Sequence, residues 1–152
     1  MSSDAGPWAL IFALPSTPLI QTLDSDIQGL FAADMSLVHN VLIRGLNSIW
    51  RNAPLVKPND VDAFAGYSIT CIDAIHKHHQ GEEKLIFPYL QTKLDMSHNL
   101  EQHEGFHATM DAFEEYMKRV QNKEETFDAE KTRELLKAFA DPLVQHLHDE
   151  VC

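Results

Sequence analysis

Cysteine and glycine are scarce in this chain of 152 residues. The two cysteines, Cys71 and Cys152, show no spacing that would suggest a disulfide framework or a thiolate metal site. Two isolated thiols fit a reducing compartment, so we expect a cytoplasmic protein. The 6 glycines are scattered and none precedes a Lys-Ser/Thr pair, which argues against a phosphate-binding loop.

Positive charge is also scarce, because 12 lysines and arginines face 23 aspartates and glutamates, for a formal net charge of −11. Such an acidic chain disfavours nucleic acid and anionic membranes as partners. No apolar run is long enough to span a bilayer. The apolar run over residues 8–14 lacks a basic segment before it and leads into Pro15 and Pro18. We therefore predict that residues 1–24 form an extended arm on the body of the protein, and not a signal peptide.

Beyond the arm the sequence shows no strand-like alternation, and apolar residues recur three or four apart, as on one face of a helix. We expect helices over residues 25–51, over 61–87 or slightly beyond, over 97–120, and from 128 onward. Pro88 should end or kink the second helix, and at Pro142 the fourth either kinks or restarts with Asp141 as its cap. The apolar positions expected to face the interior are Phe31, Met35, Val38, Leu42, Leu46, Ile49, Leu100, Met110, Phe113, Met117, Val120, Leu135, Leu136, Phe139 and Leu143. Amphipathic helices with short connections predict an all-α fold, an antiparallel up-down four-helix bundle over residues 25–152.

Histidine is abundant, and several of the 9 histidines lie on the faces that should point inward. Three pairs have the i, i+4 spacing that places both side chains on one face of a helix: His78 with Glu82, His103 with His107, and His146 with Glu150. His39 lies alone within the apolar stripe of the first helix. A buried imidazole needs hydrogen-bond partners and a buried carboxylate needs a counter-charge. A pair of metal ions held between the four helices would satisfy all of these groups together.

These motifs resemble the hemerythrin-like, HHE cation-binding family. The resemblance covers about residues 20–152, and the sequence of residues 38–47 is similar to that of fungal members. It implies a non-haem di-iron centre, with iron favoured over zinc or manganese. The ligands it implies are His39 and His78 on one iron, His103, His107 and His146 on the other, and Glu82 and Glu150 as bridges.

Two features of the motifs qualify that assignment. Oxygen-carrying hemerythrins end with His-x4-Asp, whereas this chain has His146-x3-Glu150, which argues against simple reversible oxygen carriage and is more similar to the iron-sensing and enzymatic branches. His79 and Glu83 repeat the spacing of His78 and Glu82. We prefer the latter pair as ligands, and His79 and Glu83 stay open as alternative ligands or as groups that support the ligands.

Three functions follow as hypotheses. The first is a redox module that binds or activates dioxygen or peroxide, which includes an oxidase or oxygenase acting on a small organic substrate. The second is an iron or oxygen sensor, or a metal-binding module without turnover. The third is a structural bundle with zinc or without metal. We expect a dry wall beside the centre at Leu85, Ile86 and Phe87, and we expect His76, His98 and His148 to face solvent.

Overall fold

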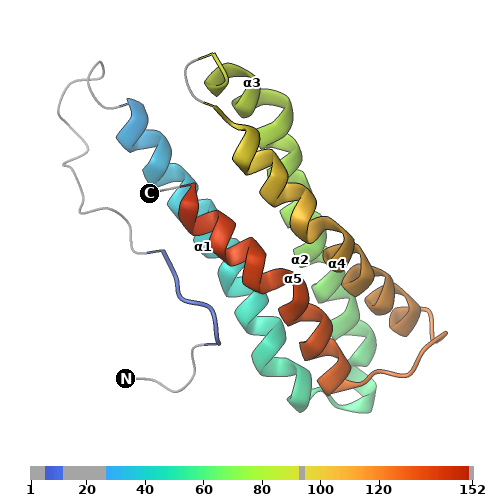
Figure 1. Cartoon of the computed structure of the whole chain (residues 1–152). Coiled ribbons are helices and arrows are strands. Elements are labelled where there is room, and N and C mark those ends of the chain that lie inside the picture. The colour runs from blue at the N-terminus through green and yellow to red at the C-terminus, as the bar shows by residue number, and fades with distance from the viewer. Residues whose placement is uncertain (1–5, 12–26, 93–94, 151–152) are drawn as a thin grey trace.

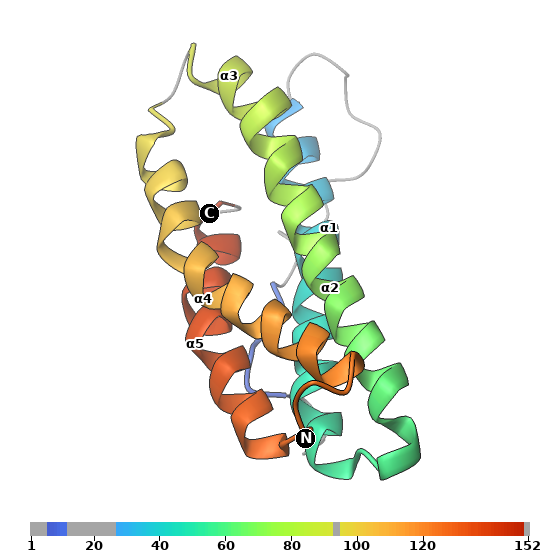
Figure 2. The same cartoon turned by 90° about the vertical axis from the view of Figure 1, so that its right-hand side faces the viewer.

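Four long helices build the part of the chain that the structure describes. The computed structural model describes residues 6–11, 27–92 and 95–150, with the backbone alone over 27–33. The helices are α1 (Ile27–Asn52), α2 (Val61–Gly81), α4 (Ser97–Gln121) and α5 (Ala129–Asp149), and the described residues contain no strand. Each packs against its neighbours in the chain, and α5 returns to α1, so the helices close a ring around one core (Figures 1 and 2). The predicted all-α antiparallel four-helix bundle is confirmed.

The connections are short. The 3₁₀ turns η1 (Ala53–Leu55) and η2 (Pro58–Asp60) join α1 to α2. The second predicted helix runs beyond residue 87, because α2 passes into a π-helical turn, η3 (Glu82–Ile86), and then into the short α3 (Phe87–Leu90). Pro88 lies in the first turn of α3, where a missing backbone N–H leaves no helical bond unmade.

Helix α5 begins and continues as one element. Its N-cap Asp128 accepts a hydrogen bond from the Lys131 backbone N–H at 2.9 Å, which satisfies one of the free donors of the first turn. The helix runs on through Pro142, so the alternative of a new segment capped by Asp141 is wrong. The Asp141 carboxylate instead accepts a hydrogen bond from Trp8 Nε1 at 3.0 Å.

The core fills the space between the four helices. Its fully buried side chains are Ile43, Leu46, Ile49, Ile72, Ile75, Phe106, Met110, Phe113, Tyr116, Met117, Leu136, Phe139, Leu143 and Leu147. Two positions predicted to face inward are wrong, since Val38 is 43% exposed and Leu100 is 42% exposed. On α1 the interior position next to Val38 is occupied by His39, which is fully buried. The side chain of Phe31 lies outside the described residues.

Residues 6–11 lie along α1 and are held by two asparagine amides. Asn47 accepts from the Trp8 N–H at 3.1 Å and donates to the Trp8 carbonyl at 2.8 Å, and Asn40 makes the same pair of bonds with Ile11 at 2.8 and 2.7 Å. Gly6 lies so close to Asn47 that a Cβ there would clash with the amide. The predicted boundary between arm and bundle, at residues 24 and 25, lies outside the described residues.

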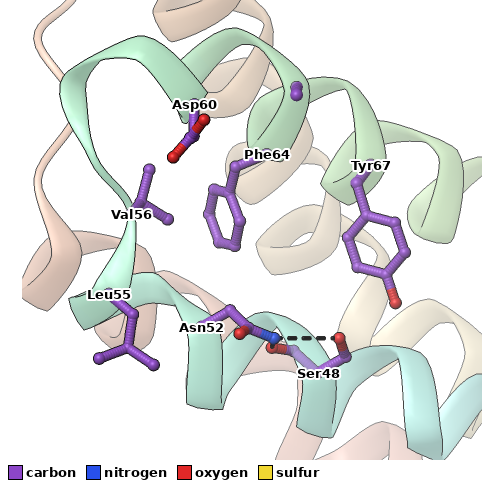
Figure 3. Close-up of a pocket in the computed structure, with 8 residues that line it drawn as sticks. Ser48, Asn52, Leu55, Val56, Asp60, Phe64 and Tyr67 are labelled. Carbon is purple, nitrogen blue, oxygen red and sulfur yellow. Dashed lines mark hydrogen bonds between the residues drawn. The ribbon is translucent and has the colours of Figure 1, made fainter.

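A shallow cleft of about 400 Å³ opens between the end of α1 and the start of α2, where Ser48, Asn52, Phe64 and Tyr67 are among the lining residues (Figure 3). Within the described part of the chain, none of the helices combines the length and the hydropathy needed to cross a bilayer.

Candidate metal centre

Seven buried or half-buried ligand-type side chains converge between the four helices. They form two groups that share one carboxylate: His79, Glu82, His103 and His146 in the first, and His39, His78, Glu82 and Glu150 in the second. Within each group, one ligand atom from every residue lies within 4.8 Å of the others. The set contains five imidazoles and two carboxylates. They come from α1, α2, η3, α4 and α5, and from Glu150, which directly follows α5.

The end of α2 explains why Glu82 belongs to both groups. At 100° per residue, Glu82 lies about 40° beyond His78 and about 60° short of His79 in rotation around the helix. Glu82 therefore projects between the two adjacent imidazoles. Its Oε1 lies 2.9 Å from His78 Nε2, and its Oε2 lies 3.6 Å from His103 Nε2. One carboxylate thus points one oxygen toward each group.

Hydrogen bonds behind the ligands fix three of the imidazoles. His39 Nδ1 lies 2.9 Å from the Leu147 carbonyl oxygen, and His103 Nδ1 lies 2.7 Å from Glu83 Oε1. Both partners only accept, so each Nδ1 carries the proton. His146 Nδ1 donates in the same way to Gln102 Oε1 at 2.9 Å. Rings held in this way direct their Nε2 atoms to the interior, which is the arrangement found around metal-bound histidines.

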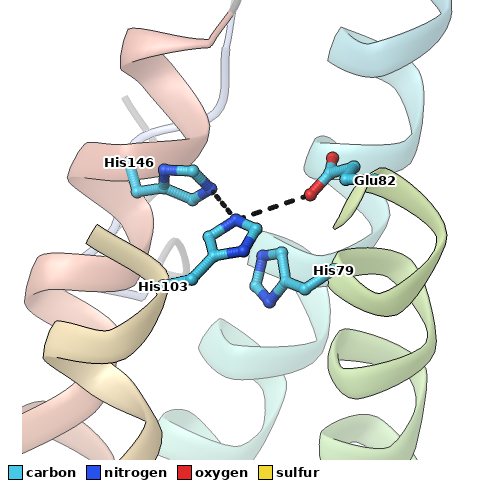
Figure 4. Close-up of side chains that lie close together, drawn as sticks. All are labelled: His79, Glu82, His103 and His146. Carbon is cyan, nitrogen blue, oxygen red and sulfur yellow. Dashed lines mark hydrogen bonds and ion pairs between the residues drawn. The ribbon is translucent and has the colours of Figure 1, made fainter. Parts of the chain in front are cut away.

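Two of these Nε2 atoms face each other. His103 Nε2 and His146 Nε2 are 2.9 Å apart, with Glu82 and His79 beside them (Figure 4). At this distance the two nitrogens share one proton in a hydrogen bond. A cation bound by both nitrogens would take the place of that proton.

The orphaned polar atoms concentrate at the same place. The buried side-chain atoms without a hydrogen-bond partner in the described structure are His39 Nε2, His78 Nε2, His79 Nδ1, His79 Nε2, Glu82 Oε1, Glu82 Oε2 and Glu150 Oε2. His78 Nε2 and Glu82 Oε1 are close, but they are not aligned for a hydrogen bond. Unsatisfied buried groups are rare in proteins, and each one is destabilising. All seven atoms belong to the two groups, so the residues present fit bound cations.

Aromatic side chains close the centre on one side. Phe106 is fully buried, with its ring 5.2 Å from that of His79 and 5.8 Å from that of His146. Phe87 is also buried, 5.4 Å from the His103 ring. The predicted dry wall is therefore right for Phe87 and wrong for Leu85, which is 76% exposed. In the wider π-helical turn, the first residue, Glu82, and the residue that follows the turn, Phe87, both face inward, while Leu85 between them faces outward.

Burial and mutual charge shift the pKa values of the centre. Burial and the neighbouring His103 imidazole lower the pKa of His79 to about 2 and that of His146 to about 3. Burial and the charge of Glu82 raise the pKa of Glu150 to about 8. Burial opposes ionisation of Glu82 too, but the His39 and His78 imidazoles outweigh it and its pKa is lowered. Without metal, one carboxylate is ionised at neutral pH and the other holds a proton, which a bound cation would replace.

The lowered histidine pKa values predict how acid affects the metal-free protein. Below pH 6.5, His79 and His146 bind protons in the unfolded chain but stay unprotonated in the folded chain until the pH is much lower. These two residues therefore make the free energy of unfolding fall as the pH falls. Glu150 acts in the opposite direction between its folded value of about 8 and its unfolded value of 4.5.

We expect His79→Leu to remove one of these contributions, so that between pH 6 and 5 its stability falls less steeply than that of the unmodified chain, by up to about 1.4 kcal/mol per pH unit. Chemical denaturation of chelator-treated protein measures this difference. The exposed His98 provides the control, since His98→Gln should leave the slope unchanged. Equal slopes for His79→Leu and the unmodified chain would contradict the account.

The structure brings together six of the seven residues that the sequence analysis named, and it places His107 elsewhere. His107 lies a helical turn further along α4 and groups with His76 and Asp111, while His79 completes the central set. Glu83 lies behind the centre as the acceptor for His103. Ligation by these residues stays a prediction. The sequence could have indicated His79, because the helical period places Glu82 between His78 and His79 in rotation around the helix. His98 is exposed as expected, whereas His76 and His148 are only partly exposed.

Comparison with known proteins places this arrangement in a family. Residues 31–150 match the family described as the Hemerythrin HHE cation binding domain. The dimeric xanthone biosynthesis cluster protein R11 of Cryptosporiopsis sp. (strain 8999) is 31% identical over 155 residues, which cover 97% of this chain and 57% of that relative. The chain thus spans little more than half of the relative's length, and no solved structure gives a significant match. Because the family match includes every residue of the two groups, the cation-binding centre and the family agree, and the chain belongs to the hemerythrin HHE cation-binding domain family.

Proposed function

We propose that the chain is a non-haem di-iron module that binds or activates dioxygen or peroxide. The observation that carries the proposal is the convergence of five imidazoles and two carboxylates, which include all the buried side-chain atoms of the described structure that lack a hydrogen-bond partner. His39, His78 and Glu150 would hold one iron, His79, His103 and His146 the other, and Glu82 would bridge them. Zinc alone needs four ligands, whereas this set offers seven residues to two ions that share one.

When bound, a ferrous pair supplies electrons for the reduction of dioxygen or peroxide. The chain's own contribution is to orient the imidazoles through the acceptors at Leu147, Glu83 and Gln102, and to limit water at Phe87 and Phe106. Glu150 holds a proton at neutral pH until cations bind, so uptake of metal should release it.

A small organic substrate is consistent with the name of the relative, which assigns that protein to a biosynthesis cluster. The cleft shown in Figure 3 does not open onto the centre. Tyr67, on its lining, precedes His78 by 11 residues, which is about 16 Å along α2. Any such substrate would reach the centre by another route.

Anaerobic reconstitution with ferrous iron tests the proposal. After gel filtration we expect about two irons per chain, oxidised on mixing with dioxygen or hydrogen peroxide, with near-ultraviolet charge-transfer absorption and oxygen consumption in proportion to bound iron. Two bound irons that raise the unfolding temperature but consume neither oxidant would favour the sensor instead. Little retained iron would contradict both.

A further inference from the structure

A third group of ligand-type residues lies outside the centre, on the surface where α2 meets α4. It consists of His76, His107 and Asp111, whose ligand atoms lie within 4.8 Å of one another. The two imidazole rings are 5.8 Å apart and tilted by 40°. None of the three residues belongs to either group of the centre.

The antiparallel packing of α2 and α4 explains why these residues meet. His76 precedes His79 by one turn on α2, and His107 follows His103 by one turn on α4. Because the helices run in opposite directions, both steps lead the same way, about 4.5–6 Å along the bundle from the centre. Phe106 separates the two sets, since its buried ring stacks on His107 at 5.7 Å and also packs against His79.

The carboxylates approach His76 without forming a hydrogen bond. His76 Nε2 lies 3.6 Å from Asp111 Oδ1 and 3.8 Å from Glu114 Oε2, and the other Glu114 oxygen pairs with Lys118 at 2.7 Å. Neither His76 nor His107 has a hydrogen bond among the described residues. The ring of His76 is 23% exposed and the Asp111 side chain 63% exposed, so solvent reaches the group and Asp111 is free to turn inward.

We propose that His76, His107 and Asp111 form an accessory site for one divalent transition-metal ion. Two imidazoles and one carboxylate, with the remaining positions open to water, are a ligand set that ferrous iron, cobalt and zinc accept. Glu114 is placed to add a second carboxylate. The exposed site binds more weakly than the centre, and its ion is removed by gel filtration. The proposal does not rest on the di-iron function.

Calorimetric titration with Co²⁺ tests the site, followed by the visible absorption of the bound ion. Iron-loaded, gel-filtered protein should take up one further Co²⁺ per chain. His76→Gln and Asp111→Asn should each weaken that uptake by about tenfold or more, by comparison with the losses that follow from changing even the supporting residues of a metal site. His98→Gln, which changes an exposed histidine at the start of α4, should have no effect.

The variant Glu82→Gln keeps this test separate from that of the centre. It lacks the shared carboxylate of the centre but retains the whole accessory group, so it should still bind Co²⁺ in a manner that depends on His76. No uptake by the loaded protein, or uptake unaffected by His76→Gln, would overturn the proposal. A loss as large in His98→Gln would show adventitious binding to surface histidines only.

Discussion

Replacing Glu82 with glutamine is expected to remove both metal ions from the chain in a single step. Glu82 is the one residue common to the two groups of the centre, and its two oxygens are directed toward different groups. A glutamine side chain has nearly the same shape but carries no charge and offers one acceptor in place of two. We expect iron content after anaerobic reconstitution to fall from about two per chain to about none.

The adjacent position supplies a matched control. Glu83→Gln makes the same chemical change one residue away, at a carboxylate that supports His103 from behind and is 38% exposed. Loss of such a supporting partner typically weakens metal binding by about 10- to 100-fold. Glu83→Gln should therefore still hold two irons at saturating metal, with lower affinity. Equal iron content in both variants would show that Glu82 does not bridge the ions.

The same pair of variants separates binding from folding. Glu82 is buried, and the neighbouring His39 and His78 imidazoles lower its pKa, so its ionised form stabilises the metal-free fold at neutral pH. The metal-free Glu82→Gln protein should therefore unfold at a lower temperature than the metal-free parent while keeping its helical content. Circular dichroism and thermal unfolding in the presence of chelator establish that the variant is folded, so that a loss of iron can be read as a loss of ligation.

Histidine 79 and histidine 107 should respond in opposite ways to replacement. The structure places His79 in the centre and His107 a turn away beside His76, whereas the family resemblance implies that His107 is the ligand. We expect His79→Gln to lower iron content from about two per chain to about one, and His107→Gln to leave it at about two. Metal analysis of gel-filtered protein, with the absorption spectrum in air, measures both.

The thermal stability of the two iron-loaded variants should differ in the same way as their iron content. Metal binding contributes to folding where the ligands converge only in the folded state, so loss of one ion should lower the unfolding temperature of the iron-loaded His79→Gln protein. His107→Gln should unfold close to the parent in iron-loaded, gel-filtered form. If His107→Gln loses an ion of the centre and His79→Gln does not, the resemblance identifies the ligand correctly and the structural assignment is wrong.

The helices and most of the centre could be predicted because both depend on the helical period. Apolar spacing located all four helices, and i, i+4 pairing placed His78 with Glu82 and His146 with Glu150 on common faces. Val38 and Leu100 were misplaced, because both sit at the margin of a stripe and the period alone does not set the width of a buried face.

The choice between His79 and His107 could not be made from spacing. His78 and His79 are adjacent, as are Glu82 and Glu83, so two registers fit equally well until the packing of α2 against α4 is known. His107 lies about 6 Å along α4 from His103. The position of the centre along the bundle axis therefore decides whether His107 reaches it, and this position cannot be read from the sequence. The π-helical turn was also hidden, and it is the reason that Leu85 faces solvent.

The asparagine contacts that hold residues 6–11 against α1 could not be predicted from the sequence either. Asn40 and Asn47 lie two helical turns apart on α1, and each pairs with both backbone groups of an arm residue. Buried asparagines within an apolar face indicate that a partner exists, but they do not identify it. The partner is a segment with no regular secondary structure, which lacks the periodicity from which a contact could be predicted.

Diffraction at the iron absorption edge, from crystals of the iron-loaded protein, tests the central claim most directly. The account predicts two anomalous peaks about 3.5–4 Å apart on either side of Glu82, one beside His39, His78 and Glu150 and the other beside His79, His103 and His146. A single peak in the centre, or a second peak bound by His107 in place of His79, would contradict it.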